Sequence, residues 1–104
     1  MPSYRLTPRA RDGFRDILEY VGAQFGDEVV DRVLARLMST FELLAANPAA
    51  GHRREDLTAD ANVRFWSEGP SLIAYRAGKR EGIEILIIER GEKDWTRLFE
   101  QDDD

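Results

Sequence analysis

Residues 83–88 read Ile83-Glu84-Ile85-Leu86-Ile87-Ile88, the most apolar segment of this 104-residue chain, and continue directly into Glu89-Arg90-Gly91-Glu92-Lys93-Asp94. Successive side chains of an extended strand point to opposite faces. One face should therefore carry Ile83, Ile85 and Ile87, and the other Leu86 and Ile88. A strand with hydrocarbon on both faces belongs in the middle of a sheet, because an edge strand would expose its side chains and its unpaired backbone.

Two amphipathic helical patterns precede this strand. The first follows Thr7-Pro8, where threonine can cap a helix and proline suits its first turn. It ends near Gly26, and Asp27 can cap the second pattern, which stops at Asn47-Pro48 because the residue before proline disfavours helical geometry. Apolar residues recur every three or four positions in both patterns. The connection between the two patterns, at Gly26-Asp27, is so short that it predicts an antiparallel helical hairpin.

The remaining segments predict short strands. Residues 4–6 form a first strand, and residues 63–67 and 72–76 form two more before the opening segment, with turns around Gly69 and over residues 77–82. Asp94 can cap a short C-terminal helix, and residues 101–104 form a short disordered acidic tail. We expect one α+β domain over residues 1–104, ordered β-α-α-β-β-β, with the helical hairpin packed on one face of a small, mainly antiparallel sheet.

Composition excludes several classes of function. A net charge of −5 argues against direct nucleic-acid binding by this chain alone. The chain has one histidine and no cysteine, which predicts no metal site, and we expect no cofactor. No apolar run approaches the roughly 20 residues that span a bilayer, and the first residues lack a signal-peptide core, so we expect a cytoplasmic protein without membrane contact.

The second face of the sheet has no predicted cover. If Trp66, Ile73 and Tyr75 lie on that face, they form an exposed apolar patch, which usually marks a partner-binding surface. A partner could also add a strand to an open sheet edge. The alternative is that the C-terminal helix or a second copy of the chain covers the patch.

Basic residues gather in the loop and sheet half of the chain. Strand ends could bring several of them together as a phosphate or carboxylate clamp, and the alternative is a set of surface ion pairs. Arg64 and Arg90 are the strongest candidates because each lies on a strand. His52 is either a solvated loop side chain or a general base for RNA cleavage. The acidic residues form no recognisable catalytic dyad, so we assign no catalytic residue.

The whole pattern resembles the ParE branch of the RelE/ParE toxin superfamily. The resemblance rests on these segments and residues in order: 4–10 (YRLTPRA), 17–21 (ILEYV), 41–48 (FELLAANP), Gly51, Arg54, Asp56, Leu57, 63–65 (VRF), 72–76 (LIAYR), 83–88 (IEILII), Gly91 and Asp94. It implies a toxin of a type II toxin–antitoxin system that inhibits DNA gyrase without being an enzyme. It also implies neutralisation by a ParD-like antitoxin of the ribbon-helix-helix type within a toxin–antitoxin hetero-oligomer.

On this resemblance, the target-contact candidates are Arg64, Arg90, Lys93 and Trp95, and the antitoxin-binding candidates are Trp66, Ile73 and Tyr75. Many ParE-like sequences carry histidine where this chain has Arg90, and arginine keeps the charge but cannot exchange a proton near neutral pH. Two alternatives stay open. One is a RelE-like, ribosome-dependent endoribonuclease in which Arg64 and Arg90 bind phosphate and Tyr75 or His52 assists proton transfer. The other is a nontoxic antitoxin-pairing module.

Overall fold

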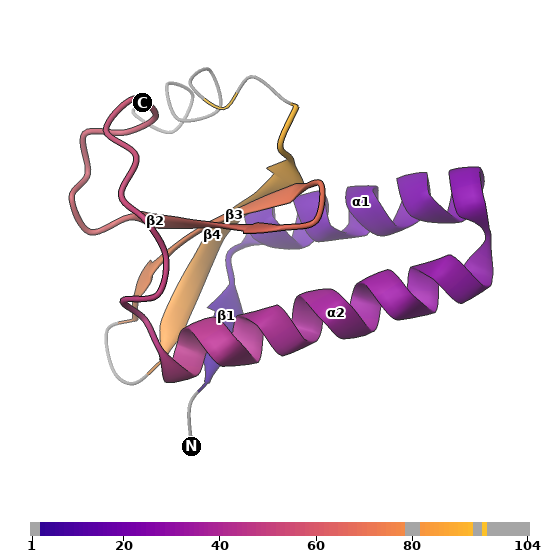
Figure 1. Ribbon diagram of the computed structural model, residues 1–104, viewed down its shortest axis with the longest axis horizontal. Coiled ribbons are helices and arrows are strands. Elements are labelled where there is room, and N and C mark those ends of the chain that lie inside the picture. Colours follow the sequence, from indigo (N-terminus) through magenta and orange to yellow (C-terminus); the bar gives the residue numbers. More distant parts are fainter. Residues whose placement is uncertain (1–2, 79–81, 93–94, 96–104) are drawn as a thin grey trace.

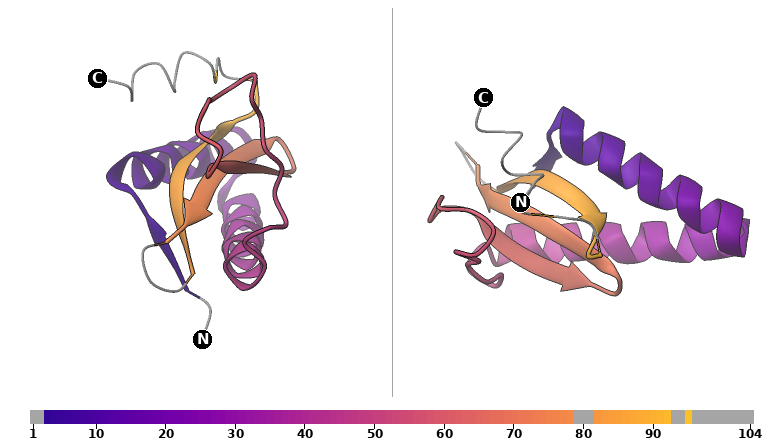
Figure 2. Two further views of the ribbon diagram at one scale, coloured as in Figure 1. Left: turned by 90° about the vertical axis from the view of Figure 1, so that its left-hand side faces the viewer. Right: turned by 90° about the horizontal axis from the view of Figure 1, so that it is seen from above.

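The computed structural model describes residues 3–78, 82–92 and 95, and it has two layers (Figure 1). The elements are β1 (Tyr4–Leu6), α1 (Pro8–Phe25), α2 (Asp27–Ala46), β2 (Arg64–Glu68), β3 (Ser71–Ala77) and β4 (Ile83–Arg90). The four strands form one sheet in the order β1-β4-β3-β2, with β1 parallel to β4 and the other pairs antiparallel. Both helices lie on the same side of this sheet (Figure 2). The predicted α+β class, element order and central position of β4 are confirmed.

A β-bulge in β4 changes which side chains face the helices. The pairing of β3 with β4 shifts between Ala74, which pairs with Ile87, and Tyr75, which pairs with Ile85. Leu86 is therefore the extra residue, and the alternation of side chains resumes one position later. The helix-side core holds Ile83, Ile85 and Ile88, whereas Ile87 lies in a second core on the opposite face. The predicted sides of Ile87 and Ile88 were wrong for this reason.

Thr7 connects the start of α1 to this bulge. Its hydroxyl oxygen accepts a hydrogen bond from the backbone N–H of Ala10 at 3.1 Å, which makes it the N-cap that the sequence predicted. The same hydroxyl donates to the carbonyl oxygen of Leu86 at 2.9 Å. One side chain thus satisfies a free amide of the helix and holds the irregular part of the central strand.

Gly13 lets α1 approach β4 closely. A Cβ atom added at this position would collide with the carbonyl oxygen of Ile88. Any side chain here would push the helix away from the sheet. Glycine is a poor helix former, but at this position it allows the helix and the sheet to pack closely.

The helical hairpin extends past one end of the sheet. Figure 1 and the right-hand view of Figure 2 show α1 and α2 running on past the turn between β2 and β3. Gly26, with a φ of 89°, separates the two helices and caps α2, and the Asp27 side chain makes no capping bond, so the predicted Asp27 cap is wrong. Phe25 at this end is 63% exposed although it belongs to the apolar pattern of α1.

The opposite face of the sheet is covered, contrary to the expected open patch. Leu57, from the loop between α2 and β2, and Trp95, which is 4% exposed, pack on it. Ile73 and Tyr75 are fully buried in the helix-side core, against which Trp66 also packs. The predicted exposed patch is therefore wrong, because the register of β2 and β3 turns these side chains toward the helices. The predicted C-terminal helix, apart from Trp95, and the tail at residues 101–104 lie outside the described residues.

Candidate partner-binding groove

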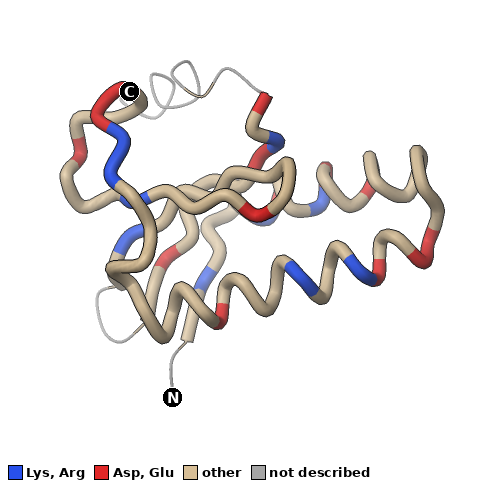
Figure 3. The backbone as a smooth tube through the Cα atoms, viewed as in Figure 1, with Lys and Arg blue, Asp and Glu red and all other residues tan. Residues whose placement is uncertain are grey.

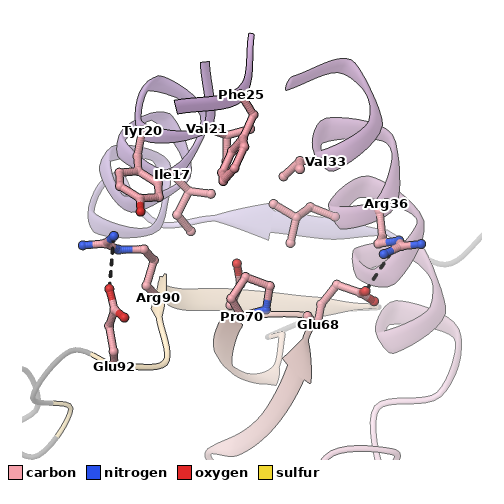
Figure 4. A pocket seen from close by; sticks show the side chains of 13 residues that line it. Ile17, Tyr20, Val21, Phe25, Val33, Arg36, Glu68, Pro70, Arg90 and Glu92 are labelled. Carbon is pink, nitrogen blue, oxygen red and sulfur yellow. Dashed lines mark ion pairs between the residues drawn. The ribbon is translucent and has the colours of Figure 1, made fainter. Parts of the chain in front are cut away.

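A groove of about 340 Å³ opens where the hairpin extends past the sheet (Figure 4). Its walls come from α1, α2, the turn between β2 and β3, and the residues at the end of β4. The lining residues are Ile17, Tyr20, Val21, Phe25, Val33, Arg36, Leu37, Glu68, Gly69, Pro70, Ser71, Arg90 and Glu92. We call this hollow the groove throughout.

The groove follows from how the helices lie on the sheet. Helices of 18 and 20 residues are roughly 27–30 Å long at 1.5 Å per residue, and their connected ends lie past the turn between β2 and β3 (Figure 1). The apolar stripes of both helices therefore continue beyond the strand ends on this side of the sheet. Phe25 and Val33 line the uncovered part, where the side-chain layer has no sheet to pack on.

Each end of the groove carries a pair of opposite charges. At one end Arg36 lies 3.8 Å from Glu68, whose other carboxylate oxygen accepts a hydrogen bond of 2.7 Å from the Thr40 hydroxyl. At the other end Arg90 lies 3.1 Å from Glu92. The dashed lines in Figure 4 mark these two ion pairs on either side of an apolar floor. An apolar floor with charged ends suits the amphipathic helix of a protein partner better than a small polar substrate.

Arg90 makes a second contact in the groove. Its guanidinium carbon lies 4.2 Å from the ring centroid of Tyr20, in a cation–π arrangement. Its side chain is 32% exposed. Of the predicted target-contact residues, Arg90 is the one that the structure places at this groove.

The other target-contact candidates lie elsewhere. Arg64 donates from Nη1 to the carbonyl oxygen of Gly51 at 3.0 Å and pairs in register with Tyr75. Arg90 pairs with Ser71, four residues along β3 from Tyr75, so the two arginines are separated by roughly 13 Å along the strand. The structure therefore does not bring these two arginines together as the clamp that was one of the two alternatives. Lys93 lies outside the described residues.

Trp95 is a packing residue in this structure. Its indole N–H donates to the carbonyl oxygen of Arg90 at 3.2 Å, and its ring packs edge-on against Phe65 with 6.2 Å between the centroids. Since the side chain is buried in the second core, it does not offer its indole ring to a partner.

Tyr75 is bound to the loop that follows α2. Its hydroxyl donates to the carbonyl oxygen of Pro48 at 2.9 Å and accepts from the backbone N–H of Gly51 at 2.7 Å. Burial raises the pKa of the hydroxyl, which opposes proton release. His52 is an exposed loop residue whose backbone pairs with Phe65 on both sides, at 2.8 and 2.7 Å. Neither geometry fits a proton-transfer group at a site shared with Arg64 and Arg90.

Three other described arginines of this half are paired locally, as the surface ion-pair alternative predicted. The described pairs are Arg53–Glu55 at 3.8 Å, Arg54–Asp56 at 2.8 Å and Arg76–Glu84 at 3.0 Å. Hydrogen bonding to Arg54 also lowers the pKa of Asp56. Figure 3 shows positive and negative positions interspersed along the chain. Among the described residues, no three acidic or histidine side chains converge to hold a metal ion, and none of the described helices is long and apolar enough to cross a membrane.

Sequence reasoning missed most of the groove. Tyr20, Phe25, Val33 and Pro70 were not singled out as site residues. Phe25 and Val33 belong to the same apolar helical patterns as the core residues, so no local signal in the sequence separates them from core positions.

Comparison with known proteins gives three concordant findings. Residues 4–95 match the family model described as the ParE toxin of the type II toxin–antitoxin system parDE. The chain is 33% identical over 88 residues to Toxin ParE1 of Caulobacter vibrioides, an alignment that covers 85% of this chain and 88% of that protein. Its fold is similar to a solved chain of the chromosomal ParDE system from P. aeruginosa, with a TM-score of 0.70, 24% identity, and coverage of 88% of this chain and 98% of that one.

Proposed function

This chain belongs to the family of ParE toxins of type II toxin–antitoxin systems, and from that premise we propose that it inhibits DNA gyrase and is neutralised by a ParD-like antitoxin. The toxin acts by binding and performs no catalysis. It works in the cytoplasm as part of a toxin–antitoxin hetero-oligomer.

The groove supports the antitoxin part of the proposal. It combines apolar side chains from two helices with opposite charges at each end, and Phe25 stands largely exposed beside it. An amphipathic antitoxin helix would cover this surface by placing apolar residues over Val33 and Val21. This assignment replaces the predicted patch of Trp66, Ile73 and Tyr75, since Ile73 and Tyr75 are fully buried.

Arg90 remains the proposed contact with the target. It is cationic, partly exposed and held on the end of the central strand. Arg64 stays a second candidate at the other end of the sheet. The endoribonuclease alternative lacks comparable support, because its phosphate-binding arginines are far apart and the Tyr75 hydroxyl is occupied by the backbone.

A supercoiling assay tests the target. Purified toxin should reduce the supercoiling of relaxed plasmid by gyrase, and Arg90→Ala should weaken this inhibition while the protein keeps its fold. Unaffected supercoiling at high toxin concentration would refute the gyrase proposal. Primer extension on messenger RNA from expressing cells covers the alternative, since new codon-linked cuts would indicate ribosome-dependent cleavage. Unchanged growth on expression without a partner would favour the nontoxic module.

A matched pair of variants tests the groove. Val33→Glu places a carboxylate on the apolar floor, and Leu43→Glu places one on the same helix at a position that is already 46% exposed. The titrant is the ParD-like antitoxin of this proposal. Calorimetric titration should show at least tenfold weaker binding for Val33→Glu and little change for Leu43→Glu, because a buried unpaired charge costs several kcal/mol. Equal affinities would place the antitoxin elsewhere.

A further inference from the structure

One peptide unit joins the groove to the second core on the opposite face of the sheet. The carbonyl oxygen of Arg90 accepts the indole N–H of Trp95 at 3.2 Å. The N–H of Gly91, the other end of the same peptide unit, donates to the carbonyl oxygen of Pro70 at 2.7 Å. Pro70 lines the groove, whereas Trp95 is buried in the second core.

The planarity of this peptide unit makes the two hydrogen bonds dependent on each other. Partial double-bond character holds its carbonyl and N–H in one plane. A rotation that changes the bond to Pro70 must therefore also change the bond to Trp95. Hydrogen bonds in series also polarise one another, so a change in the strength of one affects the next.

The side chain of Arg90 connects the same peptide unit to α1. Its guanidinium lies over the ring of Tyr20 at 4.2 Å and against Glu92 at 3.1 Å, and Figure 4 shows these side chains together at one end of the groove. A molecule that fills this end contacts the guanidinium or Pro70. Movement of Pro70 changes the hydrogen bond from the Gly91 N–H, and movement of the guanidinium changes the side-chain contacts of Arg90, whose carbonyl oxygen accepts from Trp95.

We propose that Arg90 is a positioning residue through which occupation of the groove changes the environment of Trp95 on the other face of the sheet. The identity of the occupant, an antitoxin helix, rests on the proposed function, whereas the coupling itself is a property of this chain alone. A bound antitoxin thereby influences a side chain that it does not touch.

The coupling can be measured without a partner by nuclear magnetic resonance. Trp66→Phe leaves Trp95 as the single tryptophan, so its indole N–H gives one assignable signal. In this background Tyr20→Leu removes the aromatic ring from Arg90, and Tyr20→Phe retains the ring and removes only the hydroxyl. Tyr20→Leu should shift the indole signal and speed its exchange with deuterium about two- to fivefold, which corresponds to the usual strength of a partly exposed cation–π contact. Tyr20→Phe should resemble the parent.

Two further variants separate this route from general loosening of the hairpin. Arg90→Met removes the same cation–π contact by replacing the guanidinium instead of the ring, and it should reproduce the effect of Tyr20→Leu. Phe25→Leu changes a groove residue outside the Tyr20–Arg90–Glu92 contacts and should leave the indole signal unchanged. An unchanged signal in both Tyr20→Leu and Arg90→Met would overturn the proposal, as would an equal change in Tyr20→Phe or Phe25→Leu.

This outcome is independent of the proposed function. Failure of the coupling would leave antitoxin binding in the groove intact as a hypothesis, because Val33→Glu tests that binding directly. If the antitoxin binds elsewhere, the indole measurement still tests the coupling, because it uses the toxin alone.

Discussion

Tyr75→Phe should destabilise this fold strongly by removing one oxygen atom. The hydroxyl makes two hydrogen bonds, to Pro48 and from Gly51, in a fully buried position. Losing the bond to Pro48 should cost about 0.5–1.5 kcal/mol, and leaving the buried Gly51 N–H without a partner should cost a further 1–3 kcal/mol or so. We therefore expect a loss of about 1.5–4.5 kcal/mol in the free energy of unfolding, from a total that is typically about 5–15 kcal/mol for a domain.

Urea unfolding followed by circular dichroism measures this loss. The midpoint should fall by about 1–3 M with an unchanged slope, because the surface exposed on unfolding stays the same. Tyr20→Phe is the matched control, since its ring is 43% exposed, and it should change stability by less than about 0.5 kcal/mol. If Tyr75→Phe and Tyr20→Phe have the same stability as the parent, the hydroxyl does not hold the loop after α2 and the reasoning fails.

Three further outcomes follow from features of the fold. Gly13→Ala should cost about 3 kcal/mol or more in thermal or urea unfolding, because its methyl group meets the carbonyl oxygen of Ile88, whereas Gly22→Ala in the same helix meets only a Val30 side-chain carbon at 3.2 Å and should cost far less. Thr7→Val should cost about 1–2 kcal/mol through the lost cap, with Thr7→Ser close to the parent; equal values for the two would contradict the role of the hydroxyl. Burial raises the pKa of Tyr75 above its ordinary value of about 10, so the folded state keeps a proton that the unfolded chain releases. The resulting stability is complete below about pH 10 and is lost as the pH rises through the raised value, so the parent should lose more stability than Tyr75→Phe in an alkaline titration of unfolding.

Local sequence signals predicted the elements of this fold well. Thr7, Gly26 and Asn47 mark helix boundaries through caps and proline effects that act within a few residues. The apolar segment at residues 83–88 predicted the central strand because only a strand paired on both edges can bury both of its faces. These signals depend on near neighbours in the chain, so the sequence carries them directly.

Features that depend on strand register were not predictable in this way. The bulge at Leu86 reversed the expected sides of Ile87 and Ile88, because an extra unpaired residue is invisible to a strict two-residue periodicity. The side of the sheet that Tyr75 faces depends on the pairing of β3 with both neighbours, which no local pattern encodes.

The candidate site shows the same limit. Arg90 was singled out as a target contact because it ends a rigid strand; the structure places its side chain at the groove, and its contact with the target stays a prediction. Its contact with Tyr20 was missed, since it depends on how α1 lies across the sheet. Trp95 was expected to face a target and instead closes the second core, because an aromatic ring beyond the last strand can fold back over the uncovered face of the sheet.

The parallel pairing of β1 with β4 has a consequence for how the toxin is made. Thr7 and Leu86, which hydrogen-bond at this pairing, are 79 positions apart in the chain. At a synthesis rate of about 5–20 residues per second, roughly 4–16 s separate their emergence from the ribosome. During synthesis, the helical hairpin therefore leaves the ribosome before β4, the strand that completes its core, has been made. Each newly made toxin molecule passes through an interval in which its apolar helices are accessible to chaperones, proteases and antitoxin before the sheet that holds Arg90 in place exists.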